Sequence, residues 1–322
     1  MNILGIETSC DETAAAIVQN GRKVLSNTVV SSLKEHSKFG GIIPEIASRR
    51  QLECIQAIVD QSLKEAGMTL KQVDAIAVTK EPGLIGSLLV GLSFARALSF
   101  ATNKPLLETN HLHAHLYANY LYLKTDKAPK PPKLPAIGMV VSGGHTQLYL
   151  IKDWNQLQLL GQTRDDAVGE AFDKVARILN LGYPGGPIID KLAKESGPTK
   201  LKFKAAQMKE TSDFSFSGTK TAVLYHTQKQ EKLTLTNKRN IAKAFQDSVV
   251  EILCKKAIEA CLQYKTKTLM MGGGVSANSA LRNQLELIAE RNKINVYKPN
   301  LMFCLDNAAM IAGLAYHNQK VS

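Results

Sequence analysis

A repeated unit, an apolar strand followed by a polar turn and a second apolar strand, opens each half of this 322-residue chain. The apolar runs cover residues 3–6 and 14–18 in the first half, and residues 136–141 and 147–151 in the second. Short apolar runs that flank turn residues are typical of β-hairpins. Because the unit recurs, the sequence predicts a duplicated fold, although the two copies share little identity.

Strand-like and helical segments alternate after the first unit. Residues 44–66 are amphipathic, begin with a proline that suits a first helical turn, and are followed by Gly67, a helix stop signal. This alternation of strands with helices predicts an α/β fold. The next expected segments are a strand at 74–79, a helix at 83–102, a strand at 105–108 and a helix from about 111 to 123.

Residues 124–135, KTDKAPKPPKLP, hold four Lys and four Pro and hardly any apolar side chain. Such a segment cannot continue a helix and predicts an exposed linker. The length of the chain suits two domains. We therefore expect a first domain at residues 1–123, joined by the C-terminal helix 306–322, and a second domain at residues 124–305.

The composition, 44% hydrophobic and 21% charged, is that of an ordinary globular protein. No run approaches 18 apolar residues without a charge, so we expect no membrane span. The N-terminus has no basic and then apolar leader, which predicts a cytoplasmic location. Five scattered cysteines without a CxxC pair argue against a disulfide framework and against a Cys-rich zinc site.

The net charge of +12 is unevenly distributed. Residues 1–110 hold 11 basic and 11 acidic side chains, whereas residues 111–322 hold 29 and 17. A local excess of this size suits a polyanionic partner, because each neutralised phosphate releases condensed counterions. The alternative is a Lys-rich surface that is merely solvated.

Three histidines lie within five residues, HLHAH at 111–115. On a helix His111 and His115 share a face and can hold one metal ion, whereas His113 points elsewhere. A third ligand must come from a remote carboxylate; the alternative is a pair of surface or capping histidines. Leu112 stands where the zincin motif HExxH carries its glutamate, so that motif is not matched.

Three small-residue segments could hold an anion or a nucleotide, because glycines let backbone N–H groups approach a phosphate. Two are the polar turns at 8–13 and 142–146; each could equally be a plain turn. The third, MGGGVSAN at 271–278, follows an expected strand at 268–271 and enters an expected helix at 276–291. This order is typical of nucleotide sites, although neither GxGxxG nor a Walker loop is present.

Acidic residues also gather in RDDAVGEAFDK, which is followed by YPGGP at 183–187. Glu170, Asp173 and Lys174 have helical spacing, so an exposed salt-bridged face is one interpretation. The other is a ligand site, because a Gly-Gly-Pro turn between two helices permits close approach to the backbone. No Ser-His-Asp or Cys-His context is discernible, and Cys10 has no identifiable base beside it.

Together these segments resemble the bacterial TsaD family, tRNA N6-adenosine threonylcarbamoyltransferase. The resemblance spans nearly the whole chain, and ten blocks occur in the family's order. The blocks are ILGIETSCDET (3–13), GGIIPEIASR (40–49), PGLIGSLLVG (82–91), HLHAH (111–115), VSGGHTQL (141–148), DDAVGEAFDK (165–174), YPGGP (183–187), DFSFSGTKTA (213–222), GGGVSANSALR (272–282) and DNAAMIA (306–312).

The resemblance implies an actin-like ATPase (ASKHA) fold, with two duplicated α/β lobes and a central cleft. It assigns one divalent metal ion, Fe(2+) by family usage with Zn(2+) also suitable, to His111, His115 and Asp306. The substrate contacts that it implies are Val140, Val141, Ser142, Gly143, Gly144, Asp173, Gly186, Asp190 and Asn278. Departures from the family pattern are His113, Glu81 and Leu305, none of which removes a matched ligand.

The activity implied is transfer of a threonylcarbamoyl group from threonylcarbamoyl-AMP to the N6 amine of the adenosine 3′ of the anticodon, in tRNAs that read ANN codons, with release of AMP. Asp11 and Glu12 are our candidates for removing the amine proton. Expected partners are tRNA, a paralogous non-catalytic subunit and a small P-loop ATPase. Six lysines between residues 191 and 209 are candidate tRNA contacts: Lys191, Lys194, Lys200, Lys202, Lys204 and Lys209.

Two other functions remain open from the sequence. One is a metal-dependent glycoprotease, which the lack of a glutamate beside the His pair disfavours. The other is a non-catalytic actin-like subunit that binds nucleotide and organises partners, which the three matched metal positions disfavour.

Overall fold

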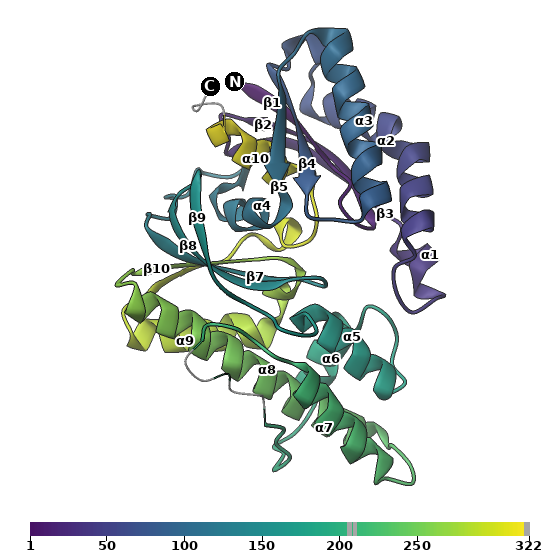
Figure 1. Cartoon of the computed structure of the whole chain (residues 1–322), viewed down its shortest axis with the longest axis vertical. Coiled ribbons are helices and arrows are strands. Elements are labelled where there is room, and N and C mark those ends of the chain that lie inside the picture. The colour runs from purple at the N-terminus through teal and green to yellow at the C-terminus, as the bar shows by residue number, and fades with distance from the viewer. Residues whose placement is uncertain (205–207, 209–210, 319–322) are drawn as a thin grey trace. The chain divides into compact units, whose positions relative to one another are not determined.

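The computed structural model describes residues 1–204, 208 and 211–318. The chain divides into two compact units, the first formed by residues 1–132 and 299–322 and the second by residues 133–298. Each unit contains one mixed β-sheet with helices packed against it, so both belong to the predicted α/β class (Figure 1).

The first unit is built on a six-stranded sheet with the order β5-β4-β1-β2-β3-β6. β1, β2 and β3 form an antiparallel meander, while β4 pairs parallel to β1 and β5 pairs parallel to β4. Central strand β1 is buried along nearly its whole length, which fits its apolar sequence. The strands are β1 Asn2–Glu7, β2 Glu12–Gln19, β3 Lys23–Ser31, β4 Ala75–Glu81, β5 Leu106–Asn110 and β6 Tyr122–Leu123.

Helices cover both faces of this sheet. α2 and α3 pack side by side on one face, and α10 packs against β1 and β2 (Figure 1). Gly5 allows this close packing, because a Cβ there would lie 2.9 Å from that of Ala312 on α10. The helices are α1 Leu33–Ser37, α2 Pro44–Ala66, α3 Ile85–Thr102, α4 His111–Tyr117 and α10 Ala308–Asn318, with 3-10 turns at Leu70–Gln72, Ala118–Tyr120 and Leu301–Phe303.

α3 is long and apolar enough to cross a membrane by length and composition alone. A single helix of this kind is weak support for a membrane span. One face of α3 packs on α2 and β4, and the opposite face leaves large apolar side chains exposed, among them Ile85, Leu89 and Phe100.

The second unit is built on a five-stranded sheet with the order β11-β10-β7-β8-β9. Its core joins the sheet to α5 and α8, where the rings of Phe172 and Phe245 meet edge to face. The strands are β7 Ala136–Val141, β8 Thr146–Asp153, β9 Gln156–Gln162, β10 Thr268–Gly272 and β11 Asn295–Tyr297. The helices are α5 Val168–Ile178, α6 Gly185–Lys194, α7 Ser217–Gln228, α8 Leu235–Gln263 and α9 Ser279–Arg291, with a 3-10 turn at Gly274–Ala277.

The two sheets repeat one topology, as the recurring sequence unit predicts. In the second sheet β7, β8 and β9 form the antiparallel meander, and β10 and β11 add in parallel beside β7. This is the order and direction of β1, β2, β3, β4 and β5 in the first sheet. The turns after β1 and after β7 therefore occupy equivalent places in the two units.

Several predicted boundaries differ from the structure. The helix expected to run to residue 123 ends at Tyr117, because the chain turns and pairs with β3 through β6. Gly185 and Gly186 form the first turn of α6 rather than a loop between helices. The helix expected from residue 276 begins at Ser279, and strand β9 was not predicted.

The division between the units also falls at other residues than we expected. Residues 124–132 group with the first unit, and residues 299–305 do so as well. The reason in the linker is hydrogen bonding, because the Arg22 guanidinium donates to the carbonyl of Pro129 and the Tyr120 hydroxyl donates to that of Pro132. The exposed Lys- and Pro-rich segment is thus attached to the first unit.

Candidate metal centre and glycine loops

The histidine pair lies at the start of α4, directly after β5. The side chain of Asn110 accepts hydrogen bonds from the backbone N–H groups of Leu112 and His113, at 3.0 and 3.1 Å, and so caps the helix. Helical spacing then places the buried rings of His111 and His115 on one face, with centroids 4.6 Å apart. This arrangement confirms the prediction that the two histidines share one helical face.

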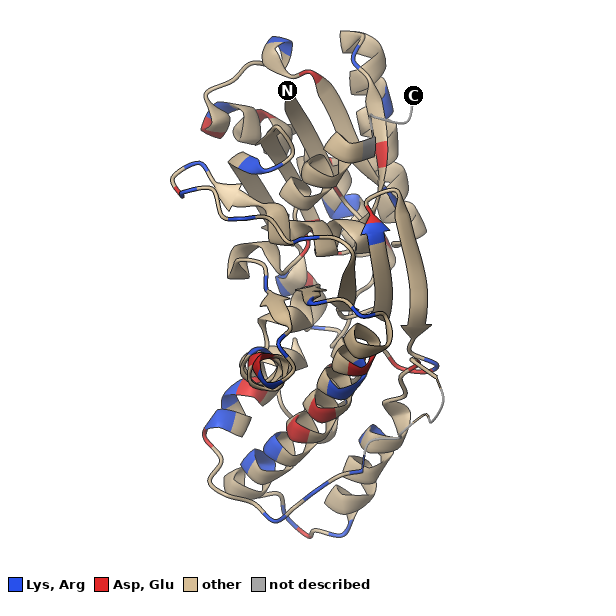
Figure 2. Ribbon diagram, turned by 90° about the vertical axis from the view of Figure 1, so that its left-hand side faces the viewer, with Lys and Arg blue, Asp and Glu red and all other residues tan. Residues whose placement is uncertain are grey.

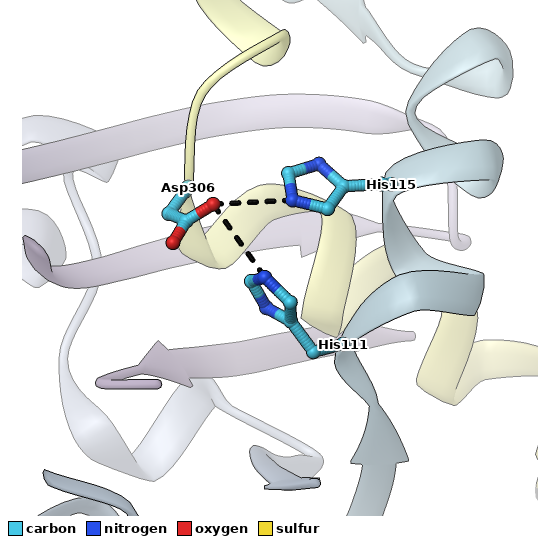
Figure 3. A group of neighbouring side chains, drawn as sticks. All are labelled: His111, His115 and Asp306. Atoms are coloured by element: carbon cyan, nitrogen blue, oxygen red, sulfur yellow. Dashed lines mark hydrogen bonds and ion pairs between the residues drawn. The ribbon is translucent and has the colours of Figure 1, made fainter. Parts of the chain in front are cut away.

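Asp306 approaches the pair from the segment before α10. Its Oδ1 lies 3.1 Å from Nε2 of His115 and 3.5 Å from Nε2 of His111, and one ligand atom from each residue lies within 4.8 Å of the others (Figure 3). Asn307 fixes this approach, because its Oδ1 accepts the N–H of Met310 in the first turn of α10. The structure therefore joins the remote carboxylate to the histidines.

Glu7 is a buried carboxylate that the motifs of the sequence did not single out. Its Oε2 lies 3.0 Å from Nδ1 of His111, and it also accepts hydrogen bonds from the Thr79 hydroxyl and the backbone N–H of Ser9. A carboxylate on Nδ1 directs the other ring nitrogen toward a metal and makes it more basic. The sequence feature that could have identified Glu7 is its place as an acidic residue at the end of an apolar strand.

The electrostatics of the two histidines differ. Burial lowers the pKa of His111, but the carboxylates of Glu7 and Asp306 outweigh burial and raise that pKa to about 9. Burial dominates at His115 and lowers its pKa. Nδ1 of His115 is buried without a hydrogen-bond partner among the described residues, whereas its Nε2 points to Asp306. Two imidazoles and one carboxylate suit Zn(2+) or Fe(2+).

His113 lies outside this group of three ligands. Its side chain is half-buried. Burial lowers the pKa of His113, and the nearby carboxylate of Glu81 offsets only part of this shift. The helical position thus separates His113 from the pair, as predicted from the spacing of HLHAH.

Asp11 and Glu12 lie in and just after the turn between β1 and β2. Burial raises the pKa of Glu12, and the carboxylates of Asp306 and Asp11 raise it further. Cys10 has a raised pKa for the same reasons, with burial as the main cause. A raised pKa disfavours the thiolate, which fits the absence of a nucleophile motif in the sequence.

The equivalent turn of the second unit, residues 142–145, is held by glycines on neighbouring segments. A Cβ at Gly169 on α5 would lie 2.7 Å from the carbonyl oxygen of Ser142. Gly273, with a φ of 89°, would bring a Cβ within 2.8 Å of the carbonyl carbon of Val141. A Cβ built on Gly143 or Gly144 meets no described atom within 4 Å, so this part of the turn has an open side.

The other predicted substrate contacts lie on helices of the second unit. Oδ1 of Asp173 accepts the N–H of Gly185 at 2.6 Å, which joins α5 to the start of α6, and burial raises the pKa of Asp173. Asp190 accepts from the Ser279 hydroxyl at 2.8 Å and pairs with Lys194 at 2.9 Å. Asn278 caps α9 through the N–H of Leu281, and Gly186 has open space where a Cβ would lie.

The predicted residues thus divide between the units. The metal ligands and the acidic turn belong to the first unit, and all the predicted substrate contacts belong to the second.

Comparisons with known proteins identify similar sequences and folds. A family model described as tRNA N6-adenosine threonylcarbamoyltransferase (TsaD) matches residues 23–313. A curated relative of that name from Clostridium botulinum (strain Hall) is 49% identical over 318 residues, which cover 98% of this chain and 92% of the relative.

Solved structures resemble the chain in fold. Full-length HypF in a phosphate- and nucleotide-bound form has a TM-score of 0.64 at 12% identity, over 99% of this chain and 46% of HypF. Component A of (R)-2-hydroxyglutaryl-CoA dehydratase from Acidaminococcus fermentans has a TM-score of 0.57 at 13% identity, over 99% of both chains. These likenesses confirm the predicted actin-like ATPase fold.

Proposed function

Because this chain belongs to the tRNA N6-adenosine threonylcarbamoyltransferase family, we propose that it transfers a threonylcarbamoyl group from threonylcarbamoyl-AMP to the N6 amine of the adenosine 3′ of the anticodon in tRNAs that read ANN codons. AMP is the leaving group. The observation that carries the proposal is a family match over residues 23–313 in a chain that also brings His111, His115 and Asp306 together. The test is incubation of purified protein with tRNA and threonylcarbamoyl-AMP, followed by nucleoside analysis.

The three clustered side chains would hold one divalent ion, Fe(2+) by family usage or Zn(2+). A bound ion supplies Lewis-acid chemistry, which polarises an oxygen of the substrate and orients it. The chain's own contribution is the orientation of the ligands, because Glu7 fixes His111 and Asn307 fixes the segment that carries Asp306. Metal analysis of protein purified without chelators identifies the ion.

In the second unit, the open side of the 142–145 turn would receive the adenylate. Ser142, Gly143 and Gly144 let a ligand approach backbone N–H groups, and Val140 and Val141, at the end of β7, lead into the turn. Asp173 and Asp190 offer carboxylates to ribose or adenine, and Gly186 and Asn278 complete the proposed contacts. Support comes from the open space at Gly143, Gly144 and Gly186.

Asp11 and Glu12 would remove the proton from the attacking amine. Burial of Glu12 supports this role, because a raised pKa makes a carboxylate a stronger base. Replacement of either residue by alanine should lower turnover and leave tRNA affinity within a few-fold. Unchanged turnover in both variants would remove them from the mechanism.

The basic surplus of the second unit would bind the tRNA backbone. Figure 2 shows Lys and Arg spread over its helices and loops, interleaved with acidic residues on α8. Of the six candidate lysines, five are exposed, Lys194 pairs with Asp190, and Lys209 lies outside the described residues.

Charge reversal of Lys200, Lys202 and Lys204 should weaken tRNA binding. It should also flatten the salt dependence by about one log unit for each phosphate that is no longer neutralised. Reversal of Lys64 and Lys71, exposed lysines of the first unit, is the control. An unchanged slope would identify the three lysines as solvated surface.

We propose a cytoplasmic protein that works with a paralogous non-catalytic subunit and a small P-loop ATPase. The exposed apolar face of α3 supports a protein partner, because soluble proteins rarely leave apolar patches uncovered. Replacement of Leu89 by aspartate should weaken assembly in sedimentation experiments with the candidate subunits.

A further inference from the structure

The turn between β1 and β2, residues 8–12, has its backbone carbonyls directed alternately to two sides. On one side the carbonyl of Ser9 accepts the N–H of Leu84 at 2.8 Å. The carbonyl of Asp11 accepts both the N–H of Ser32, at 3.0 Å, and its hydroxyl, at 2.8 Å. These bonds attach the turn to the start of α3 and to the segment after β3.

The three carbonyls on the other side converge on a single atom. Nε2 of Gln51, on α2, lies 3.3 Å from the carbonyl oxygen of Thr8, 2.8 Å from that of Cys10 and 3.2 Å from that of Glu12. Gln51 is only 1% exposed. Each of the five carbonyls in the turn therefore has a partner. The two N–H bonds of the Gln51 amide are shared among three of them, and the Ser87 hydroxyl also donates to the Cys10 carbonyl, at 3.4 Å.

The orientation of the Gln51 amide follows from this surrounding. Its Oε1 is buried and has no hydrogen-bond partner among the described residues. A flipped amide would set Oε1 against three carbonyl oxygens, which only a donor can face. A buried acceptor without a partner is costly, so the turn keeps this residue at the expense of one unsatisfied oxygen.

One side chain of this turn reaches the predicted metal ligands. The hydroxyl of Ser9 lies 3.2 Å from Nδ1 of His111, and Asp306 acts electrostatically on Cys10 and Glu12. A shift of the turn would therefore displace the acidic candidates and the hydroxyl beside a metal ligand together.

We infer that Gln51 is a positioning residue, whose amide nitrogen holds the carbonyls of residues 8, 10 and 12 and thereby fixes Asp11 and Glu12 for the transfer reaction. The inference rests on the proposed function. Gln51 acts through the turn, because its amide nitrogen donates to backbone carbonyls and not to the metal ligands. Placement errors of about 1 Å can cost ~100-fold in rate, so a residue of this kind can matter greatly.

The test compares two substitutions at this position. Gln51→Met keeps an unbranched side chain of similar length and removes the donor, and kcat should fall ~10- to 100-fold with KM for tRNA within about twofold. Gln51→His offers one ring N–H in place of the amide. Nε2 of histidine is as many bonds from Cα as Nε2 of glutamine, so this N–H can reach the same carbonyls. Gln51→His should therefore recover part of the lost kcat.

A second measurement detects loosening of the turn without relying on activity. Cys10 lies within the turn and is half-buried, while Cys304 is fully buried elsewhere in the same unit. In native Gln51→Met protein, alkylation of Cys10 should become several-fold faster, on the order of 5-fold or more, while Cys304 stays protected. Peptide mass spectrometry measures both sites in one sample.

The matched control is Gln61→Met on the same helix, where the exposed Gln61 bonds to Glu65 at the protein surface. It should change neither kcat nor alkylation. Wild-type kcat in Gln51→Met, or equal acceleration of alkylation at Cys10 and Cys304, would overturn the inference. Wild-type protein without any transfer activity, assayed together with the proposed partner subunits, would overturn the proposed function itself.

Discussion

The two units share a sheet topology and differ in the turn that follows the first strand of each sheet. In the first unit this turn carries acidic side chains and is tied on both sides by hydrogen bonds to its carbonyls. In the second unit the turn carries glycines and has an open side. The comparison teaches that the duplicated fold supplies two equivalent positions, and that the residues placed there decide which one offers side-chain chemistry and which one offers backbone.

The largest effect should come from breaking the side-chain chemistry of the first unit. His115→Ala removes a buried imidazole that we propose as a ligand, so metal binding should be lost and the transfer rate should fall at least ~100-fold. Metal content and nucleoside analysis measure the two effects. His113→Ala, on the same helix but outside the ligand group, should retain the metal. Equal metal content in the two variants would contradict the proposed centre.

A smaller effect should follow from weakening the support of that centre. Glu7→Gln keeps the size of the side chain but removes the charge that faces Nδ1 of His111. Metal affinity should fall by about 10- to 100-fold, as for other carboxylates behind metal-binding histidines. A competition titration with a chelator measures the change, and wild-type affinity would show that Glu7 has only a packing role.

Two glycine substitutions test the backbone chemistry of the second unit. Gly169→Ala should lower the free energy of unfolding by about 1–3 kcal/mol, because the new Cβ meets the carbonyl of Ser142 at 2.7 Å. Gly143→Ala should change stability by less than about 0.5 kcal/mol, since its Cβ enters open space, yet raise KM for threonylcarbamoyl-AMP. Denaturant unfolding and steady-state kinetics separate the two. The reverse order of stability would contradict the packing described for this turn.

The smallest effect is expected on stability, at Asp166, an acidic residue of the second unit that forms two ion pairs. Burial raises the pKa of Asp166, but hydrogen bonds from Lys174 and Lys220, at 2.6 and 2.8 Å, outweigh burial and lower it. The stability contributed by this lowered pKa is fully present at a pH above the pKa of Asp166 in the unfolded chain, about 3.9. It is lost as the pH falls through the lower pKa of Asp166 in the folded protein.

Asp166→Asn should therefore destabilise the protein by roughly 1 kcal/mol or less at pH 7, because Lys174 is partly exposed. The difference from wild type should shrink below about pH 4. Urea unfolding at pH 7 and pH 3 measures it. A difference that stays constant between these two pH values would show that charge is not its cause.

Local sequence signals predicted much of the fold. Helix α2 has the predicted ends, because Pro44 and Gly67 act within a single turn of backbone. The recurring hairpin units predicted the duplication, and the spacing of His111 and His115 predicted a shared face. Where the prediction was wrong, as at the end of α4, pairing of residues 122–123 with a strand about 100 residues earlier prevailed over local helical preference.

The sequence by itself determined the types of residue available, their local spacing and, through the ten blocks, the family. The family resemblance already implied that Asp306 joins the two histidines, and the structure brings it in front of His111. The tertiary structure alone decided that Glu7 lies behind His111 and that Gln51 lies beneath the turn that carries Asp11. The physical reason is that helix and turn signals act over a few residues, whereas these contacts join segments about 40 to 195 residues apart. Only the packing of the sheet and its helices sets such distances.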